Sequence, residues 1–221
     1  MRNKTAQLEE SLKGLVGAHQ RMMLESLLRH LTFLDGEVQS LDEEVAERMR
    51  PFEEDMARLG EIHGVGQRTA EEVLAETGTD MSRFPTSAHI ASWAKLCPGN
   101  NESAGKRKSG CIGHGNVWLR STLVQAAWAA SRTKGTYLSA LYHRLAARRG
   151  AKRAIIAVAH VILGIIYSLL RHKSSYKDLG DKYFDERNRQ SVVQRIVRRL
   201  ESLGYAVTLE LTPPPHQEVI V

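Results

Sequence analysis

A long uncharged apolar run limits most strongly what this chain can fold into. Residues 154–170 (AIIAVAHVILGIIYSLL) contain no Asp, Glu, Lys or Arg. As a helix the run would be roughly 26 Å long, which is shorter than the ~30 Å hydrocarbon core of a membrane. The run also contains His160, Gly164 and Ser168. We therefore expect a buried central helix and no membrane partner, with His160 as a histidine of the core rather than a ligand.

Amphipathic segments around this run predict an all-α, mainly helical fold. A helix from Asn116 to about Ser131 is followed by one from Tyr137 to Arg149, and a last one runs from about Asp185 to Leu203. The inward positions expected on the first of these helices are Leu119, Leu123, Ala126, Ala127 and Ala130. Residues 205–211 alternate well enough for one short C-terminal strand, the only strand expected. Residues 212–221 are expected to form a disordered tail.

The N-terminal region, residues 1–60, has the pattern of a coiled coil. From Leu24 the apolar residues are spaced by alternating steps of three and four, and an extra four-residue step beside Pro51 predicts a kink. The apolar positions are Leu24, Leu27, Leu31, Leu34, Val38, Leu41, Val45, Met49, Phe52, Met56 and Leu59. One interpretation is a helical hairpin packed on the chain's own core. The other, favoured because the apolar stripe is narrow, is a homodimer or higher oligomer through residues 24–59.

Charge is distributed unevenly along the chain. Residues 1–60 hold 8 Lys or Arg against 12 Asp or Glu, whereas residues 61–221 hold 23 against 13. No Asp or Glu occurs from Ser103 to Lys177, a span that contains 14 Lys or Arg. Because an ordinary surface mixes both signs, nucleic acid is the first-choice partner. Cys97 and Cys111 lack zinc-site spacing, and the charged N-terminus argues against a signal peptide, so a reducing compartment is expected.

A short glycine motif resembles a helix-hairpin-helix. Residues 62–70 (IHGVGQRTA) lie between two helical segments, the second of which ends near Gly78. Two glycines would let the backbone approach a phosphate, and the following helix would point its amide groups at it. The candidate nucleic-acid-binding residues are Gly64, Val65, Gly66, Arg68 and Thr69. The alternative is a tight structural hairpin with no ligand.

Residues 96–116 form a polar, glycine-rich stretch between two helical segments. Its glycines argue against a regular helix or strand, and a loop of this length is usually functional. It carries Ser103 and the basic cluster Lys106-Arg107-Lys108, and Arg120 follows in the next helix. Flexible backbone, hydroxyl groups and positive charge suit a site that handles phosphate.

Three motifs together resemble the C-terminal half of the bacterial RNA-guided (bridge-RNA) insertion-sequence transposases. They are Gly64-Val65-Gly66-x-x-Thr69-Ala70, Cys97-Pro98-Gly99-x-x-x-Ser103 and Gly115-Asn116-x-x-Leu119-Arg120. The resemblance covers about residues 1–211, and the block from Pro98 to Arg120 is its most specific part. It implies a helical transposase domain over residues 61–211. That domain would comprise the helix-hairpin-helix at 62–78, a serine loop at 96–116 and basic helices at 117–203.

The resemblance also implies chemistry and partners. Ser103 matches the family's nucleophilic serine, which would attack a DNA phosphodiester and form a covalent phosphoserine link. Lys106, Arg107, Lys108 and Arg120 are near enough in sequence to stabilise the charge. The implied partners are DNA and a structured guide RNA, in the bacterial cytoplasm at the nucleoid.

Two features depart from the family's pattern. Ala104 follows Ser103, whereas many relatives place Gly there. The family also has an N-terminal resolvase-like nuclease domain with four acidic residues (DEDD), but here Met1 immediately precedes the coiled-coil region. We therefore expect a truncated chain with no metal site of its own, and magnesium only with the missing domain. The competing hypothesis is a non-catalytic helix-hairpin-helix DNA-binding or regulatory protein that associates through its coiled coil.

Overall fold

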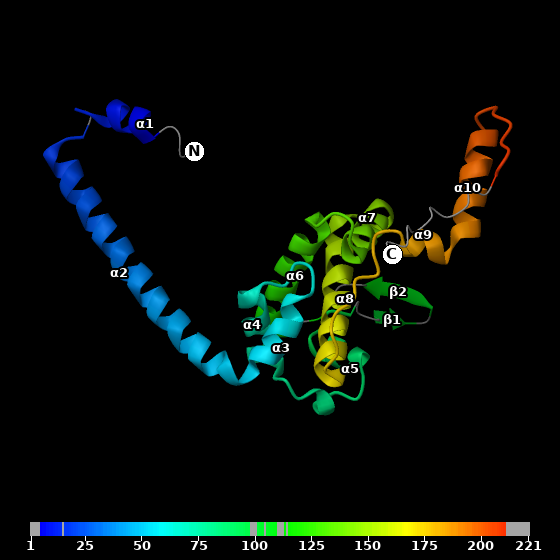
Figure 1. Cartoon of the computed structure of the whole chain (residues 1–221), viewed down its shortest axis with the longest axis horizontal. Helices are drawn as coiled ribbons and strands as arrows, with labels where there is room; N and C mark the ends of the chain where they lie inside the picture. Colours follow the sequence, from blue (N-terminus) through cyan, green and yellow to red (C-terminus); the bar gives the residue numbers. More distant parts are fainter. Residues whose placement is uncertain are drawn as a thin grey trace, which may run out of the picture. The chain divides into compact units, whose positions relative to one another are not determined.

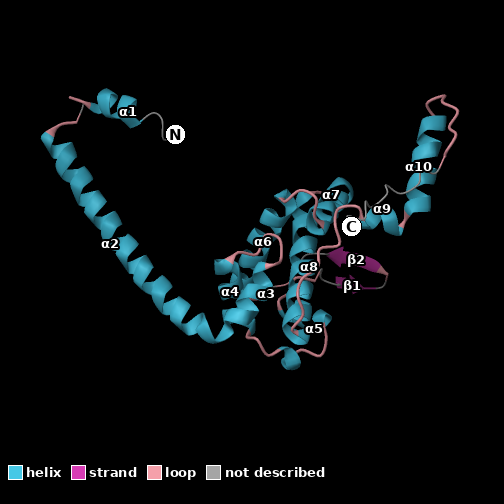
Figure 2. Ribbon diagram, viewed as in Figure 1, coloured by secondary structure: helices cyan, strands magenta, loops and turns pink. Residues whose placement is uncertain are grey.

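The chain is mainly helical, which confirms the predicted fold class (Figure 2). The computed structural model describes residues 5–14, 16–97, 101–103, 105–109, 113 and 115–210. The chain divides into two compact units, Met1–Glu53 and Glu54–Val221. The predicted tail at 212–221 lies outside the described residues.

The first unit consists of helices α1 (Thr5–Leu12) and α2 (Ala18–Met49). None of the residues of α2 is buried, and the large apolar side chains of its heptad stripe, from Leu24 to Val45, are 37–64% exposed. A 3-10 turn, η2 (Arg50–Phe52), follows with Pro51 near its start, which confirms the predicted break. The heptad pattern did not predict the second break, between α1 and α2, where Gly14 has a φ of +79°.

The predicted coiled-coil segment, residues 24–59, is too long at its C-terminal end. Helix α3 (Glu53–Gly60) belongs almost entirely to the second unit, and its Leu59 is fully buried there. Asp55 of α3 is also buried and accepts hydrogen bonds from Arg58 (2.6 Å) and from Lys173 (2.8 Å), far along the chain. The extra four-residue step in the heptad pattern therefore marks where apolar residues turn from the stripe to a core.

Helix α8 (Ala151–His172) forms the centre of the second unit (Figure 1). Helices α5 (Ser87–Trp93), α6 (Val117–Arg132) and α7 (Tyr137–Arg149) pack against it. Its buried side chains include Ile155, Val158, Ile162, Leu163, Ile166 and Leu170. By length and composition alone α8 could cross a membrane. Its burial against three helices confirms the predicted core helix.

Helices α6 and α7 begin where the sequence predicts. The side chain of Asn116 accepts a hydrogen bond from the Leu119 amide (3.0 Å), and that of Thr136 accepts one from the Ser139 amide (3.3 Å). The five predicted inward residues of α6 are all buried, at 0–1% exposure. The remaining elements of the unit are α4 (Gln67–Thr77), η3 (Met81–Arg83), α9 (Tyr183–Arg187) and α10 (Arg189–Glu201).

The C-terminal region differs from the prediction in two ways. The expected helix from Asp185 to Leu203 is interrupted at Asn188, which separates α9 from α10. The expected strand is wrong, because residues 205–210 adopt no strand. After Gly204, whose φ is +90°, the chain turns back so that the Tyr205 amide donates to the Leu200 carbonyl (3.2 Å). Alternation alone cannot form a strand without a neighbouring strand to pair with.

Asp178 fastens the segment after α8 to the start of α7. Its carboxylate accepts hydrogen bonds from the amides of Tyr137 (3.2 Å) and Gly180 (2.9 Å) and from the phenol of Tyr176 (2.9 Å). Burial, and then the hydrogen bond to Asp178, raise the pKa of Tyr176. The phenol therefore keeps its proton and remains a donor.

We predict that Asp178→Ala lowers the free energy of unfolding by about 2 kcal/mol. The substitution leaves the partly buried donors of Tyr137 and Tyr176 without their acceptor, and each such loss costs about 1–3 kcal/mol when the group stays dry. Urea denaturation followed by circular dichroism measures the change. The matched control is Asp181→Ala, three residues away on an exposed side chain, which should change stability little. Equal stability of the two variants would contradict a fastening role for Asp178.

Candidate functional site

The glycine hairpin between α3 and α4 packs on α6. Gly64 has a φ of +88°, and a Cβ atom there would lie 2.4 Å from the carbonyl oxygen of Ala126 and 2.6 Å from the amide nitrogen of Ala130. Backbone atoms of a packed helix cannot move aside cheaply, so only glycine fits. The next residue, Val65, is buried and donates its amide proton to the Ile62 carbonyl (2.9 Å). Gly64 and Val65 thus have a structural role, as in the alternative of a tight structural hairpin that the sequence left open.

The other half of the hairpin faces outward. Gly66 precedes the first turn of α4, is exposed, and has no described atom within 4 Å of the position of a Cβ. Arg68 is exposed and Thr69 is half-buried in the same turn. Of the five hairpin residues proposed from sequence, Gly66, Arg68 and Thr69 therefore reach the surface. The N-terminal amides of a helix at such a place favour an anion.

The serine loop contains a two-stranded antiparallel ribbon, so the expectation of no regular structure there is wrong. Strand β1 (Asn101–Ser103) pairs with β2 (Lys106–Ser109), and the register places Ser103 opposite Lys106 and Glu102 opposite Arg107. Gly105, with a φ of +73°, lies between the strands. A glycine in the left-handed region permits the tight reversal. The backbone therefore holds Ser103 at the end of β1, across from the basic strand.

The two ends of the serine loop meet at the C-terminal end of α5. Leu96 is buried, and its amide donates to the Ala91 carbonyl (3.1 Å). On the return, a Cβ at Gly115 would lie 2.7 Å from Cβ of Lys95 and 2.8 Å from the Ala94 carbonyl oxygen. Glycine is thus needed for this close approach. The base of the loop is fixed by packing, while residues 98–100, 104, 110–112 and 114, with Cys111 among them, lie outside the described residues.

Arg120 belongs to the serine loop rather than to the hairpin. One guanidinium nitrogen (Nη1) donates to the Gly113 carbonyl (3.3 Å) on the return of the loop. The hairpin contacts α6 at Ala126 and Ala130, which is roughly 9–15 Å further along the helix axis at 1.5 Å per residue. The candidate residues therefore form two groups, one on each end of α6.

Two hydrogen bonds that the sequence pattern did not predict fix α6 against α4. The Thr122 hydroxyl donates to the Glu72 carboxylate, and the Asn116 side-chain amide donates to that of Glu76. Glu72 and Glu76 are four residues apart and therefore share one face of α4. The spacing of the two glutamates in the sequence indicates that they lie on one face of a helix. Only the packed structure identifies their partners on α6. These bonds hold the start of α6, and so Arg120, in a set position relative to the hairpin's second helix.

No metal centre is present among the residues that the structure describes. Within them, no group of three or more His, Cys, Asp or Glu side chains could hold a metal ion. Cys97, at the base of the serine loop, lies with its Sγ 3.9 Å from Nδ1 of His160 on α8. This pair offers two atoms that could ligate a metal ion, fewer than the three or four protein ligands of a typical zinc site.

Comparisons with known proteins match the region that contains both groups. A family model described as "Transposase IS116/IS110/IS902 family" matches residues 56–143. The transposase for insertion sequence element IS1111A of Coxiella burnetii is 32% identical over 172 residues, which are 73% of this chain and 46% of that protein. The uncharacterized 43.6 kDa protein of insertion element IS110 of Streptomyces coelicolor is 31% identical over 149 residues, 60% of this chain and 35% of that protein. The chain spans less than half the length of these curated relatives.

The two hairpin glycines give a matched pair of variants. We predict that Gly64→Ala lowers the melting temperature by several degrees, because the new methyl group meets the backbone of α6 and the residue needs a positive φ. Gly66→Ala, at an ordinary φ of −95° and in open space, should lower the melting temperature less, because it costs only the preference for glycine over alanine at the N-cap of α4. Differential scanning calorimetry compares them. Equal melting temperatures would show that Gly64 is not constrained by α6.

Proposed function

The chain carries, over residues 56–143, a domain of the Transposase IS116/IS110/IS902 family, and we propose that it supplies the DNA-binding and strand-joining part of DNA transposition. Family membership implies transposition and DNA as the partner. The finer proposal is that Ser103 is the nucleophile. The observation that carries it is the ribbon register, which sets Ser103 across from Lys106 at the end of a hairpin whose second strand is basic.

The proposed chemistry has two steps. In the first, the Ser103 hydroxyl loses its proton as its oxygen forms a bond to the phosphorus of a DNA phosphodiester. The bond to one deoxyribose oxygen breaks, and that oxygen takes up a proton. In the second, the hydroxyl group of another DNA strand attacks the phosphoserine and releases the serine. Each step exchanges one phosphate ester for another, so joining needs no external energy. Positive charge from β2 and Arg120 would stabilise the phosphate as charge develops on it.

Within the described residues no group of three or more His, Cys, Asp or Glu side chains could hold a metal ion, and the steps above name only groups of this chain and of DNA. We propose that the carboxylates of a resolvase-like domain bind magnesium, and that this domain lies in the length by which the curated relatives exceed this chain. Under this proposal the serine loop is one half of an active site. The other half comes from a separate stretch of polypeptide.

The proposed DNA contacts use the outward half of the hairpin and the acid-free region. Gly66, Arg68 and Thr69 begin α4, whose positive dipole end suits a DNA phosphate. Helices α6, α7 and α8 contain no Asp or Glu. These acid-free helices also suit the structured guide RNA that the resemblance implies. A DNA partner is consistent with a bacterial protein located in the cytoplasm at the nucleoid.

We further propose that α2 joins two copies of the chain. Its stripe of apolar residues from Leu24 to Val45 repeats at heptad spacing and is exposed in the single chain. A second copy would bury this stripe. The proposed oligomer is a homodimer or a higher assembly.

The nucleophile is tested by trapping it. With the resolvase-like domain of a full-length relative and Mg²⁺ supplied, a nicked suicide DNA substrate should give a covalent protein–DNA species on denaturing electrophoresis. Ser103→Ala should abolish this species, whereas Ser109→Ala, a serine on the partner strand, should retain it. If supplemented wild type gives no such species, the catalytic proposal fails and a non-catalytic DNA-binding role replaces it.

The self-association is tested by charge in the stripe. We predict that Leu31→Asp with Leu34→Asp makes the chain monomeric. Burying two unpaired carboxylates between the helices would cost more free energy than burial of the remaining apolar stripe provides. The control carries the same charges outside the stripe, at Ser26→Asp with Ser40→Asp, and should keep the mass of wild type. Light scattering gives the masses. Unchanged mass in the leucine variant would contradict the proposal.

A further inference from the structure

The outer face of α6 carries two exposed tryptophans. Its solvent-facing positions recur at steps of three and four and form what we call the tryptophan stripe: Trp118, Ser121, Gln125, Trp128 and Arg132. Trp118 is 78% exposed and Trp128 is 37% exposed. The outer face of a surface helix is ordinarily polar or charged. Large aromatic side chains in such positions indicate a binding surface, here roughly 21 Å long at 1.5 Å per residue.

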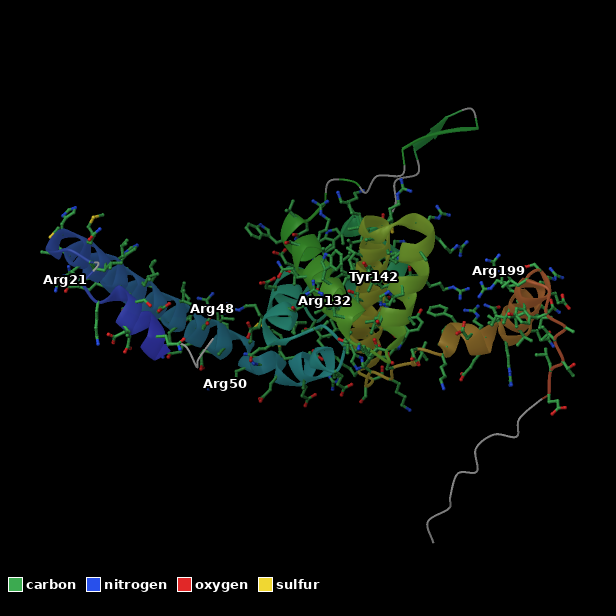
Figure 3. The ribbon with its side chains drawn as sticks, turned by 90° about the horizontal axis from the view of Figure 1, so that it is seen from above. Arg21, Arg48, Arg50, Arg132, Tyr142 and Arg199 are labelled. Carbon is green, nitrogen blue, oxygen red and sulfur yellow. The ribbon has the colours of Figure 1, made fainter. Side chains whose placement is uncertain are left out.

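The aromatic surface continues onto α7. The ring of Trp128 lies 5.9 Å from that of Tyr142, which in turn lies 5.2 Å from the ring of His143. Figure 3 labels Tyr142 together with Arg132, the basic end of the stripe. Ring contacts of this kind favour one orientation of the Trp128 indole. They therefore give the stripe part of a preformed stacking surface.

The charge around the stripe favours a polyanion. Arg132 closes the stripe, and Arg148 and Arg149 end the neighbouring helix α7. The carboxylates of Glu72 and Glu76 on α4 contact this region, and both are engaged there. They accept hydrogen bonds from Thr122 and Asn116 respectively. Aromatic platforms within a basic region are the combination that binds single-stranded nucleic acid.

We propose that the tryptophan stripe binds an unpaired DNA strand, with bases stacked on Trp118 and Trp128 and a phosphate held by Arg132. This inference rests on the proposed function, because strand joining leaves unpaired bases next to the broken phosphodiester. Helix α6 begins directly where the serine loop ends, so a strand leaving that loop meets Trp118 first. In a duplex the faces of the bases are covered by the neighbouring base pairs. The stripe therefore binds unpaired DNA in preference to duplex DNA. Stacking makes this preference independent of sequence.

Fluorescence anisotropy with a labelled oligo-dT strand and a labelled duplex of equal length tests the proposal on the whole chain. Trp118→Ala with Trp128→Ala should weaken binding of the single strand on the order of a hundredfold, about tenfold for each stacking tryptophan. Duplex binding should change by less than about threefold. The matched control is Trp93→Ala, which removes a 43% exposed tryptophan on α5, outside the stripe. It should bind the single strand as wild type does.

Intrinsic fluorescence gives a second readout that does not depend on affinity. The chain has three tryptophans, so Trp93→Phe leaves only those of the stripe. Single-stranded DNA should quench the fluorescence of this variant, because a stacked base contacts the indole. A chain with Trp118→Phe and Trp128→Phe keeps only Trp93 and should not be quenched.

The outcomes separate this inference from the proposed function. Either of two results would overturn the proposal that the stripe binds DNA: unchanged single-strand affinity of the double alanine variant, or no quenching of the Trp93→Phe protein at saturating single strand. The Ser103 adduct would remain a separate test of the proposed function. Tighter binding of an RNA strand of equal length overturns DNA as the occupant. A change in mass of the double variant by light scattering, without a change in DNA affinity, assigns the stripe to a protein interface and also overturns it. Wild type that binds neither strand nor duplex contradicts the proposed function itself.

Discussion

The arrangement of the second unit depends on the burial of one apolar helix. Helix α8 contains no charged residue from Ala154 to Leu170, and ten of its side chains are buried against the helices around it. Removing this much apolar surface from water is the main driving force available to a domain of this size. It obliges α6 to present Leu119, Leu123 and Ala126 inward, and it thereby leaves Trp118 and Trp128 outside. The buried core thus determines which face of α6 is open to a ligand.

Some glycines of the second unit allow close packing, and others lie at accessible positions. Gly64 and Gly115 are needed because helix or loop backbone lies within 3 Å of where a side chain would begin, whereas Gly66 stands in open space. The same motif therefore contains one residue that fixes the hairpin on α6 and another that leaves the start of α4 accessible. The serine loop follows the same division, since its base is packed against α5 while Gly105 turns the ribbon that carries Ser103. Functional residues of proteins often lie on loops that a rigid scaffold positions.

The sequence predicted the helices well because their inward faces and caps are local. Asn116 and Thr136 cap the helices that they were expected to begin or precede, and the apolar run at 154–170 lies within α8. Features that depend on strand pairing or on packing were missed. The ribbon forms despite its glycines, residues 205–210 of the expected strand pair with no strand among the described residues, and Leu59 leaves the heptad stripe for a core. Likewise, the spacing of Glu72 and Glu76 could not reveal that Thr122 and Asn116 are their partners. For the candidate site, sequence could name Ser103 and the basic residues, but not that Arg120 groups with the serine loop while Gly64 serves the core.

We propose that Ser103 becomes covalently joined to DNA. Mass spectrometry of the trapped complex tests this proposal, after digestion of the protein with a protease and of the DNA with a nuclease. The peptide containing Ser103 should carry a phosphate-linked nucleotide on the serine oxygen. A nucleotide located on any other residue, or a complex that leaves every peptide unmodified, would contradict it.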